Sequence, residues 1–67
     1  MHITFNSEIQ EIPDALMLIQ VLEGKELSDK KGIAVAVNGN VIPRSLWPET
    51  SLQNNDSILV IKAAQGG

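Results

Sequence analysis

The strongest structural signal in this chain lies in residues 33–43, IAVAVNGNVIP. Its first five residues form a short apolar run rich in β-branched side chains, which is typical of a strand inside a sheet. Asn38-Gly39-Asn40 then favours a tight turn, because Asn and Gly both tolerate positive φ. Val41-Ile42 follows as a short return strand, which Pro43 stops. The segment therefore predicts a β-hairpin.

A second hairpin is expected at the start of the chain. Residues 1–6 alternate, with Ile3 and Phe5 on one face, and this period of two predicts a half-buried strand. Asn6-Ser7 supplies turn residues. The apolar residues of the return segment, Ile9 and Ile12, lie three positions apart, which favours a bulge or a frayed end.

One main helix is expected between the two hairpins, over residues 14–23. Asp14 is a suitable N-cap, because its carboxylate can accept hydrogen bonds from the free backbone N–H groups of a first helical turn. Gly24 is a suitable stop, since it accepts the left-handed conformation common just after a helix. The apolar residues on one helical face are Ala15, Leu18, Ile19 and Leu22.

The last third of the chain adds a short helical turn and one more strand. Residues 43–48, PRSLWP, predict one turn of α- or 3₁₀-helix that packs Leu46 and Trp47. Asn54-Asn55-Asp56 predicts another tight turn. Residues 57–64 predict a strand centred on the apolar run at 58–61.

The order β-β-α-β-β-(short helix)-β predicts an α+β protein with a β-grasp, or ubiquitin-like, roll. We expect a mixed sheet of four to five strands with one main helix packed across it, and the last strand beside the first. Each segment's local preference agrees with this arrangement. Residues 1–67 are expected to form a single domain, with residues 63–67 as a flexible C-terminal tail.

Composition and charge exclude several classes of protein. The chain has no cysteine and one histidine, which excludes disulfide scaffolds and thiol nucleophiles and leaves no expected metal site. A net charge of −3 has the wrong sign for neutralising phosphates, so we expect no nucleic acid partner. No apolar run approaches the roughly 20 residues that span a bilayer, and the N-terminus is no signal peptide. We therefore expect a cytoplasmic protein without a membrane partner.

The sequence offers little for catalysis. Glu23 and Glu26 could form a paired-carboxylate site, but a solvated helix face beside Lys25 is the better interpretation. There is no phosphate-binding loop and no Ser-His-Asp set. We expect no enzymatic activity and no catalytic residues.

The end of the chain, KAAQGG at residues 62–67, is its most informative feature. A Gly-Gly end is thin enough to enter a narrow tunnel, and six extended residues reach about 20 Å at about 3.3 Å each. The reactive group would be the Gly67 carboxylate, activated by coupling to AMP and then attacked by sulfur or by an amine. We expect Ala64, Gln65 and Gly66 to enter partner active sites ahead of it. The alternative is an ordinary frayed terminus.

Residues 37–47, VNGNVIPRSLW, resemble the ThiS family, the sulfur carriers of thiamine biosynthesis. That family shows a strand ending in Asn, a tight turn, an apolar pair, Pro-Arg, and a Trp three residues after the Arg. In this chain these features are Asn38, Val41-Ile42, Pro43-Arg44 and Trp47. Further matches across essentially the whole chain are Ile3, Phe5, Asn6, Asp56, Ile58 and Gly66-Gly67. Asn55 departs from the family, which usually has Gly there, and the helix matches loosely.

The resemblance implies a carrier that binds no cofactor and has no catalysis of its own. A ubiquitin-activating-type adenylating enzyme (ThiF-like) would use ATP and Mg²⁺ to adenylate Gly67. Sulfur from a cysteine desulfurase route would convert the adenylate to a thiocarboxylate. Thiazole synthase (ThiG-like) would then take the sulfur into the thiazole ring of thiamine.

Arg44 and Trp47 are candidate partner contacts. Trp47 could be a binding hot spot, although the core is the more common place for such a residue in a small domain. Arg44 could contact an acidic patch on a partner or bind carbonyl groups of its own loop. Exposed apolar residues of the sheet are expected to supply the rest of the binding surface.

Three other functions stay open at this point. A molybdopterin synthase small subunit would share the tail chemistry, but such chains are usually longer and the Pro-Arg-x-x-Trp segment argues against one. A protein modifier would instead end with Gly67 on a lysine of another protein. A plain β-grasp interaction domain would leave the tail unused, so deletion of Gly66-Gly67 would change nothing.

Overall fold

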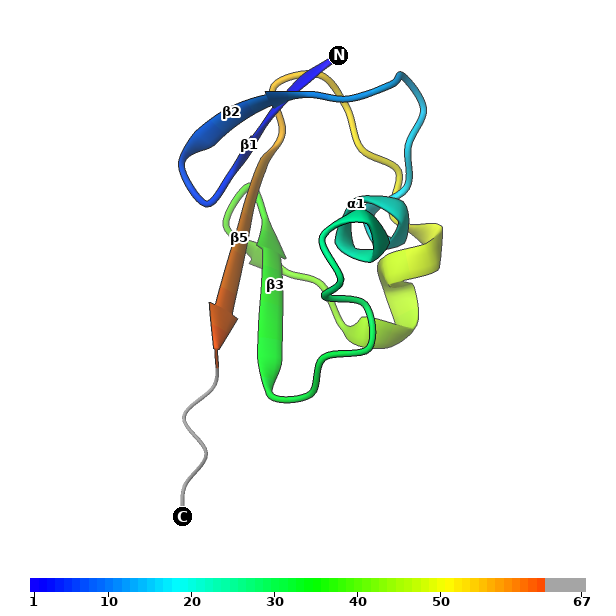
Figure 1. Ribbon diagram of the computed structural model, residues 1–67, viewed down its shortest axis with the longest axis vertical. Coiled ribbons are helices and arrows are strands. Elements are labelled where there is room, and N and C mark those ends of the chain that lie inside the picture. Colours follow the sequence, from blue (N-terminus) through cyan, green and yellow to red (C-terminus); the bar gives the residue numbers. More distant parts are fainter. Residues whose placement is uncertain (63–67) are drawn as a thin grey trace.

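The computed structural model describes residues 1–62 of the 67-residue chain (Figure 1). Five strands form one mixed sheet in the order β2-β1-β5-β3-β4. Helix α1 and the 3₁₀-helix η1 lie on one side of this sheet, as Figure 1 shows. The elements are β1 (His2–Phe5), β2 (Glu8–Glu11), α1 (Leu18–Gly24), β3 (Ile33–Val37), β4 (Asn40–Val41), η1 (Arg44–Glu49) and β5 (Ser57–Lys62).

Strand β5 occupies the centre of the sheet, which confirms the predicted pairing of the last strand with the first. It runs parallel to β1, with Thr4 opposite Ser57, and antiparallel to β3 from Ile33 opposite Lys62 onward. The predicted extension of this strand to residue 64, and the predicted tail at 63–67, lie outside the described residues.

Both predicted hairpin turns are confirmed, and both are two-residue turns with positive φ. Asn6 and Ser7 have φ of 48° and 73°, and Asn38 and Gly39 have 51° and 84°. Positive φ at both central residues matches the right-handed twist of the flanking strands. The expected bulge or frayed end is wrong, because β1 and β2 pair without interruption from His2–Glu11 to Phe5–Glu8.

Two asparagine side chains extend the hydrogen bonding of β5 beyond its paired residues. The Oδ1 atom of Asn6 accepts from the Val60 N–H at 2.9 Å, on the β1 side. The Oδ1 atom of Asn38 accepts from the Ser57 N–H at 2.9 Å, on the β3 side. Each asparagine therefore forms a turn through its backbone and holds the central strand through its amide group.

Helix α1 begins at Leu18, so the prediction that Asp14 caps it is wrong. The Asp14 carboxylate lies 3.0 Å from the N-terminal ammonium of Met1, and Ala15 has a φ of 63°. Met17 precedes the first turn, and its N–H donates to Oε1 of Gln20 at 2.8 Å. Ala15 therefore lies outside the helix, and the buried helical residues are Leu18, Val21 and Leu22.

The helix ends one residue later than the sequence predicted, and its left-handed terminating residue lies two positions later. Gly24 is its last helical residue, and the residue with a left-handed backbone is Glu26, at φ 60°. The Glu26 N–H donates to the Glu23 carbonyl at 3.0 Å, and the Leu27 N–H donates to the Leu22 carbonyl at 2.8 Å. This pair of bonds forms a Schellman motif, in which Glu26 holds a position that glycine usually fills.

The core lies between the sheet and the two helices. Trp47 on η1 is 1% exposed and its indole N–H donates to the Ile42 carbonyl at 2.9 Å. The predicted packing of Leu46 is wrong, because its side chain is 45% exposed. No helix within residues 1–62 has the length and apolar character needed to cross a membrane. The buried core residues are Ile3, Phe5, Leu18, Val21, Leu22, Val35, Val37, Trp47, Leu52 and Ile58.

Replacing Glu26 by glycine is expected to stabilise the fold. Glycine adopts positive φ without the steric cost that a Cβ atom brings, so Glu26→Gly should raise the free energy of unfolding by about 0.5 to 1 kcal/mol. Urea denaturation followed by circular dichroism measures this change. The matched control is Lys25→Gly, at a residue with a φ of −104°, which should lower stability. Destabilisation by Glu26→Gly would contradict the prediction.

Candidate functional site

The tail residues predicted to carry the chemistry, Ala64, Gln65, Gly66 and Gly67, lie outside the described residues. The structure describes the residue that precedes the tail segment 63–67. Lys62 is the last residue of β5 and pairs with Ile33 at the start of β3. The tail segment therefore follows directly from the central strand of the sheet.

The face of the sheet opposite the helices carries exposed apolar side chains. Ile58 of β5 is buried in the core. Because side chains alternate along a strand, Leu59 and Ile61, at odd-numbered offsets from Ile58, lie on the opposite face. They are 46% and 48% exposed. The strand register places Ala34 beside Ile61, and Ala36 beside both Leu59 and Val41. We define the outer face as Ala34, Ala36, Val41, Leu59 and Ile61.

The outer face lies outside the main core cluster. Ala36 at its centre is only 8% exposed, but Val41, Leu59 and Ile61 around it are exposed, which makes this face a candidate docking surface. Val41 at its β4 edge is 67% exposed. Contiguous exposed apolar patches on small proteins commonly mark sites of protein–protein interaction. The sequence did not identify these residues, because the continuous apolar run of β5 hides which of its side chains face the core. The described structure separates them through the alternation of the strand.

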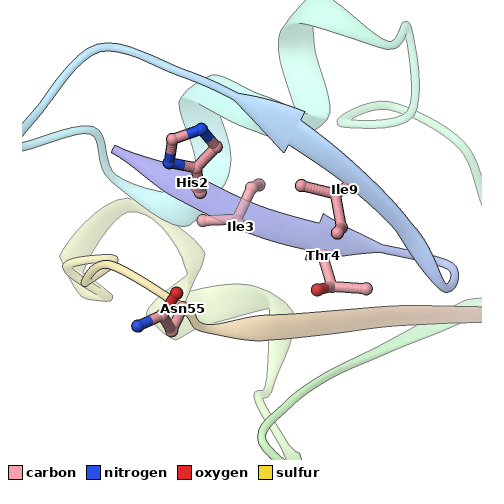
Figure 2. A pocket seen from close by; sticks show the side chains of 5 residues that line it. All are labelled: His2, Ile3, Thr4, Ile9 and Asn55. Carbon is pink, nitrogen blue, oxygen red and sulfur yellow. The ribbon is translucent and has the colours of Figure 1, made fainter.

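A pocket of about 420 Å³ opens beside the first hairpin, formed by β1 and β2. Figure 2 shows its lining side chains, with His2, Ile3 and Thr4 from β1, Ile9 from β2 and Asn55 from the turn before β5. His2 Nε2 lies 3.4 Å from a Glu11 carboxylate oxygen. No group of three potential metal ligands gathers anywhere within residues 1–62.

The Arg44 side chain makes hydrogen bonds within its own chain. Its guanidinium group donates to the Ser28 carbonyl at 2.6 Å and to the Lys30 carbonyl, and its Cζ atom lies 4.4 Å from the centroid of the Trp47 ring. Of the two alternatives for Arg44, the structure shows the contact with loop carbonyls. The side chain stays exposed, whereas the Trp47 beneath it belongs to the core. The Pro-Arg-x-x-Trp segment thus fastens the loop before β3 to η1.

Comparisons with known proteins agree on one family. A family model described as the ThiS family matches residues 3–67. The sulfur carrier protein ThiS of Escherichia coli (strain K12) is 29% identical over 68 residues, covering 100% of both chains.

Solved structures show the same fold. The crystal structure of a thiamine biosynthesis protein, ThiS, from Geobacter metallireducens has a TM-score of 0.87 at 20% identity and covers 100% of both chains. A solution NMR structure of a thiamine biosynthesis protein from that organism has a TM-score of 0.77 at 20% identity, covering 100% of this chain and 88% of the other. These similarities confirm the predicted β-grasp fold.

Replacement of Arg44 by lysine is expected to loosen the loop while keeping the charge. A lysine ammonium group cannot reproduce the two-point contact or the planar stacking of guanidinium, so Arg44→Lys should lower the free energy of unfolding by about 1 kcal/mol. Thermal unfolding measures this loss. The control is Lys31→Ala, which removes a cation from the same loop and should leave stability nearly unchanged. An Arg44→Lys variant as stable as the wild type would contradict the role assigned to these contacts.

Proposed function

The chain belongs to the ThiS family, and from this membership we propose that it carries sulfur in thiamine biosynthesis on the carboxyl group of Gly67. The single observation that supports this most directly is the span of the family match. It runs from residue 3 to residue 67 and so includes the Gly-Gly end as well as the β-grasp core. In this proposal the protein is a cytoplasmic carrier on which partner enzymes act.

The chemistry begins with a carboxylate that does not react by itself. Oxide is a poor leaving group, and the negative charge repels nucleophiles. In the proposed route an adenylating enzyme of the ubiquitin-activating type uses ATP and Mg²⁺, and a Gly67 carboxylate oxygen displaces pyrophosphate from the α-phosphorus. A persulfide from a cysteine desulfurase route then displaces AMP and forms an acyl disulfide, and a thiol reduces its S–S bond to leave the thiocarboxylate. Thiazole synthase takes this sulfur into the thiazole ring.

The length of the C-terminal segment supports a route in which the carrier supplies the carboxyl group and its partners supply the catalysis. The six residues from Lys62 to Gly67 span at most about 20 Å when extended, at about 3.3 Å per residue. A partner can therefore hold the folded domain outside its active site while the tail reaches inside. The carrier needs no catalytic group of its own for this task.

The outer face is the surface on which we propose that the partners dock. Leu59 and Ile61 lie on the same strand that leads to the tail, and Ile61 is the neighbour of Lys62. A partner that covers these side chains buries apolar area next to the point where residues 63–67 begin. Docking and delivery of the carboxyl group are thereby coupled through one rigid strand.

Mass spectrometry of the intact protein tests the proposed chemistry. The protein is incubated with its cognate adenylating enzyme, ATP, Mg²⁺ and a sulfide source, and we expect a mass gain equal to one oxygen-to-sulfur exchange, localised to Gly67. A variant that lacks Gly67 is the control and should show no gain. Heavier protein conjugates without sulfur gain would favour a protein modifier. Sulfur transfer to a molybdopterin precursor in place of thiazole would favour the molybdopterin synthase alternative.

Substitutions on the outer face test the docking surface. Leu59→Thr and Ile61→Thr each place a β-branched residue, which strands favour, but remove exposed apolar area. Each should weaken binding to the adenylating enzyme at least about tenfold, which equals about 1.4 kcal/mol, as measured by isothermal titration calorimetry.

The matched control for these variants is Leu46→Thr. Leu46 is 45% exposed, close to the 46% of Leu59, but lies on η1, on the other side of the sheet. This variant should bind as the wild type does. Equal weakening by all three substitutions would show that binding does not depend on the outer face.

A further inference from the structure

The basic side chains of this acidic protein gather at one end of the sheet. Of the five Lys and Arg residues, four belong to segments that meet there, and we call these four the basic rim: Lys30, Lys31, Arg44 and Lys62. In Figure 1 the loop before β3, the start of η1 and the end of β5 all lie at the lower end of the molecule. Residues 63–67 follow from that same end.

A side-chain hydrogen bond and a strand pairing connect the segments that carry the basic rim. The Arg44 guanidinium group donates to the Lys30 carbonyl. Lys31 lies two residues before Ile33, which pairs with Lys62 across β3 and β5. The fifth cation, Lys25, lies elsewhere, with its ammonium group 4.6 Å from the centroid of the Phe5 ring. The segments that carry the four rim residues are therefore connected to one another in the fold.

The positive charge of the basic rim is not paired within the described structure. The ion pairs found among residues 1–62 are Met1–Asp14 and His2–Glu11, and neither includes a rim residue. All four rim side chains are exposed. Asp29 is the one carboxylate of the loop segment 28–32. Outside that segment and the basic rim, the chain carries one lysine, Lys25, and seven carboxylates. The basic rim thus differs in charge from the acidic remainder of the chain.

We infer that the basic rim docks on an acidic surface around the opening through which a partner enzyme admits the tail, and that it steers the tail end toward that opening. This inference rests on the proposed function, because it concerns how the same tail is delivered. Charges act over a Debye length of about 8 Å at physiological salt, so only a partner surface close to the tail opening can sense them. Steering of this kind raises association rates by about 10- to 1,000-fold.

The chemistry of the rim favours an acidic protein over a polyanion. A nucleic acid would extend past four cations and meet the seven carboxylates on the rest of the chain. An enzyme surface can confine its negative charge to the area that faces the rim. Arg44 contributes in two ways, since it adds a charge and fixes the loop that carries Lys30 and Lys31.

Association kinetics with the cognate adenylating enzyme provide the test, at 50 and 500 mM NaCl. The test variant is Lys31→Gln/Lys62→Gln, which removes two rim charges. The control is Gln10→Glu/Gln53→Glu, which changes the net charge by the same amount on β2 and before the turn at 54–55, away from the rim. We expect the test variant to associate about tenfold more slowly at low salt and the difference to shrink at high salt. The control should associate at the wild-type rate.

The outcomes separate this inference from the function on which it rests. If the enzyme adenylates the wild type, measured as pyrophosphate release, but the test variant associates as fast as the wild type, the basic rim has no steering role. Equal slowing of test and control variants would assign the effect to net charge and also overturn the inference. No pyrophosphate release with the wild type would refute the proposed function and the inference together. Nuclear magnetic resonance shifts at rim residues with inorganic pyrophosphate or a short oligonucleotide alone would identify a different ligand and overturn it.

Discussion

Every other part of this sheet depends on the pairing of β5 with strands on both of its sides. The parallel pairing with β1 is short, and it joins parts of the chain as far apart as Asn6 and Val60, 54 positions away. The amide groups of Asn6 and Asn38 supply hydrogen bonds to β5 N–H groups that the neighbouring backbones do not reach. A net contribution of about 0.5 to 1.5 kcal/mol is typical of one hydrogen bond, so these two turn residues help to hold a short central strand.

The same strand divides its side chains between the core and the outer face. Ile58 packs in the core, whereas Leu59 and Ile61 form part of the outer face. Lys62 ends the strand and belongs to the basic rim. In six residues β5 combines a core contact, the proposed docking surface and the attachment of the tail segment. Changes that disturb its pairing therefore affect all three at once.

The sequence predicted correctly those parts of the fold that depend on the preferences of neighbouring residues. The Asn38-Gly39 turn followed from backbone preference, and the place of Trp47 in the core followed from its size. The start of α1 could not be predicted, because distant groups decide it: the Asp14 carboxylate pairs with the N-terminal ammonium, and the Leu18 N–H donates to the Thr50 carbonyl. The outer face was likewise hidden, since a run that is apolar on both sides of a strand does not reveal which side is exposed. The chemistry expected of Gly67 rests on sequence and family.

The central position of β5 also bears on how the protein is made. Both hairpins can form while the ribosome is still translating, but neither meets its neighbour in the sheet until residues 57–62 have emerged. Long-range pairing of this kind folds late, and strands that wait for it expose unpaired edges. A copy broken off before β5 would thus remain an open substrate for proteases.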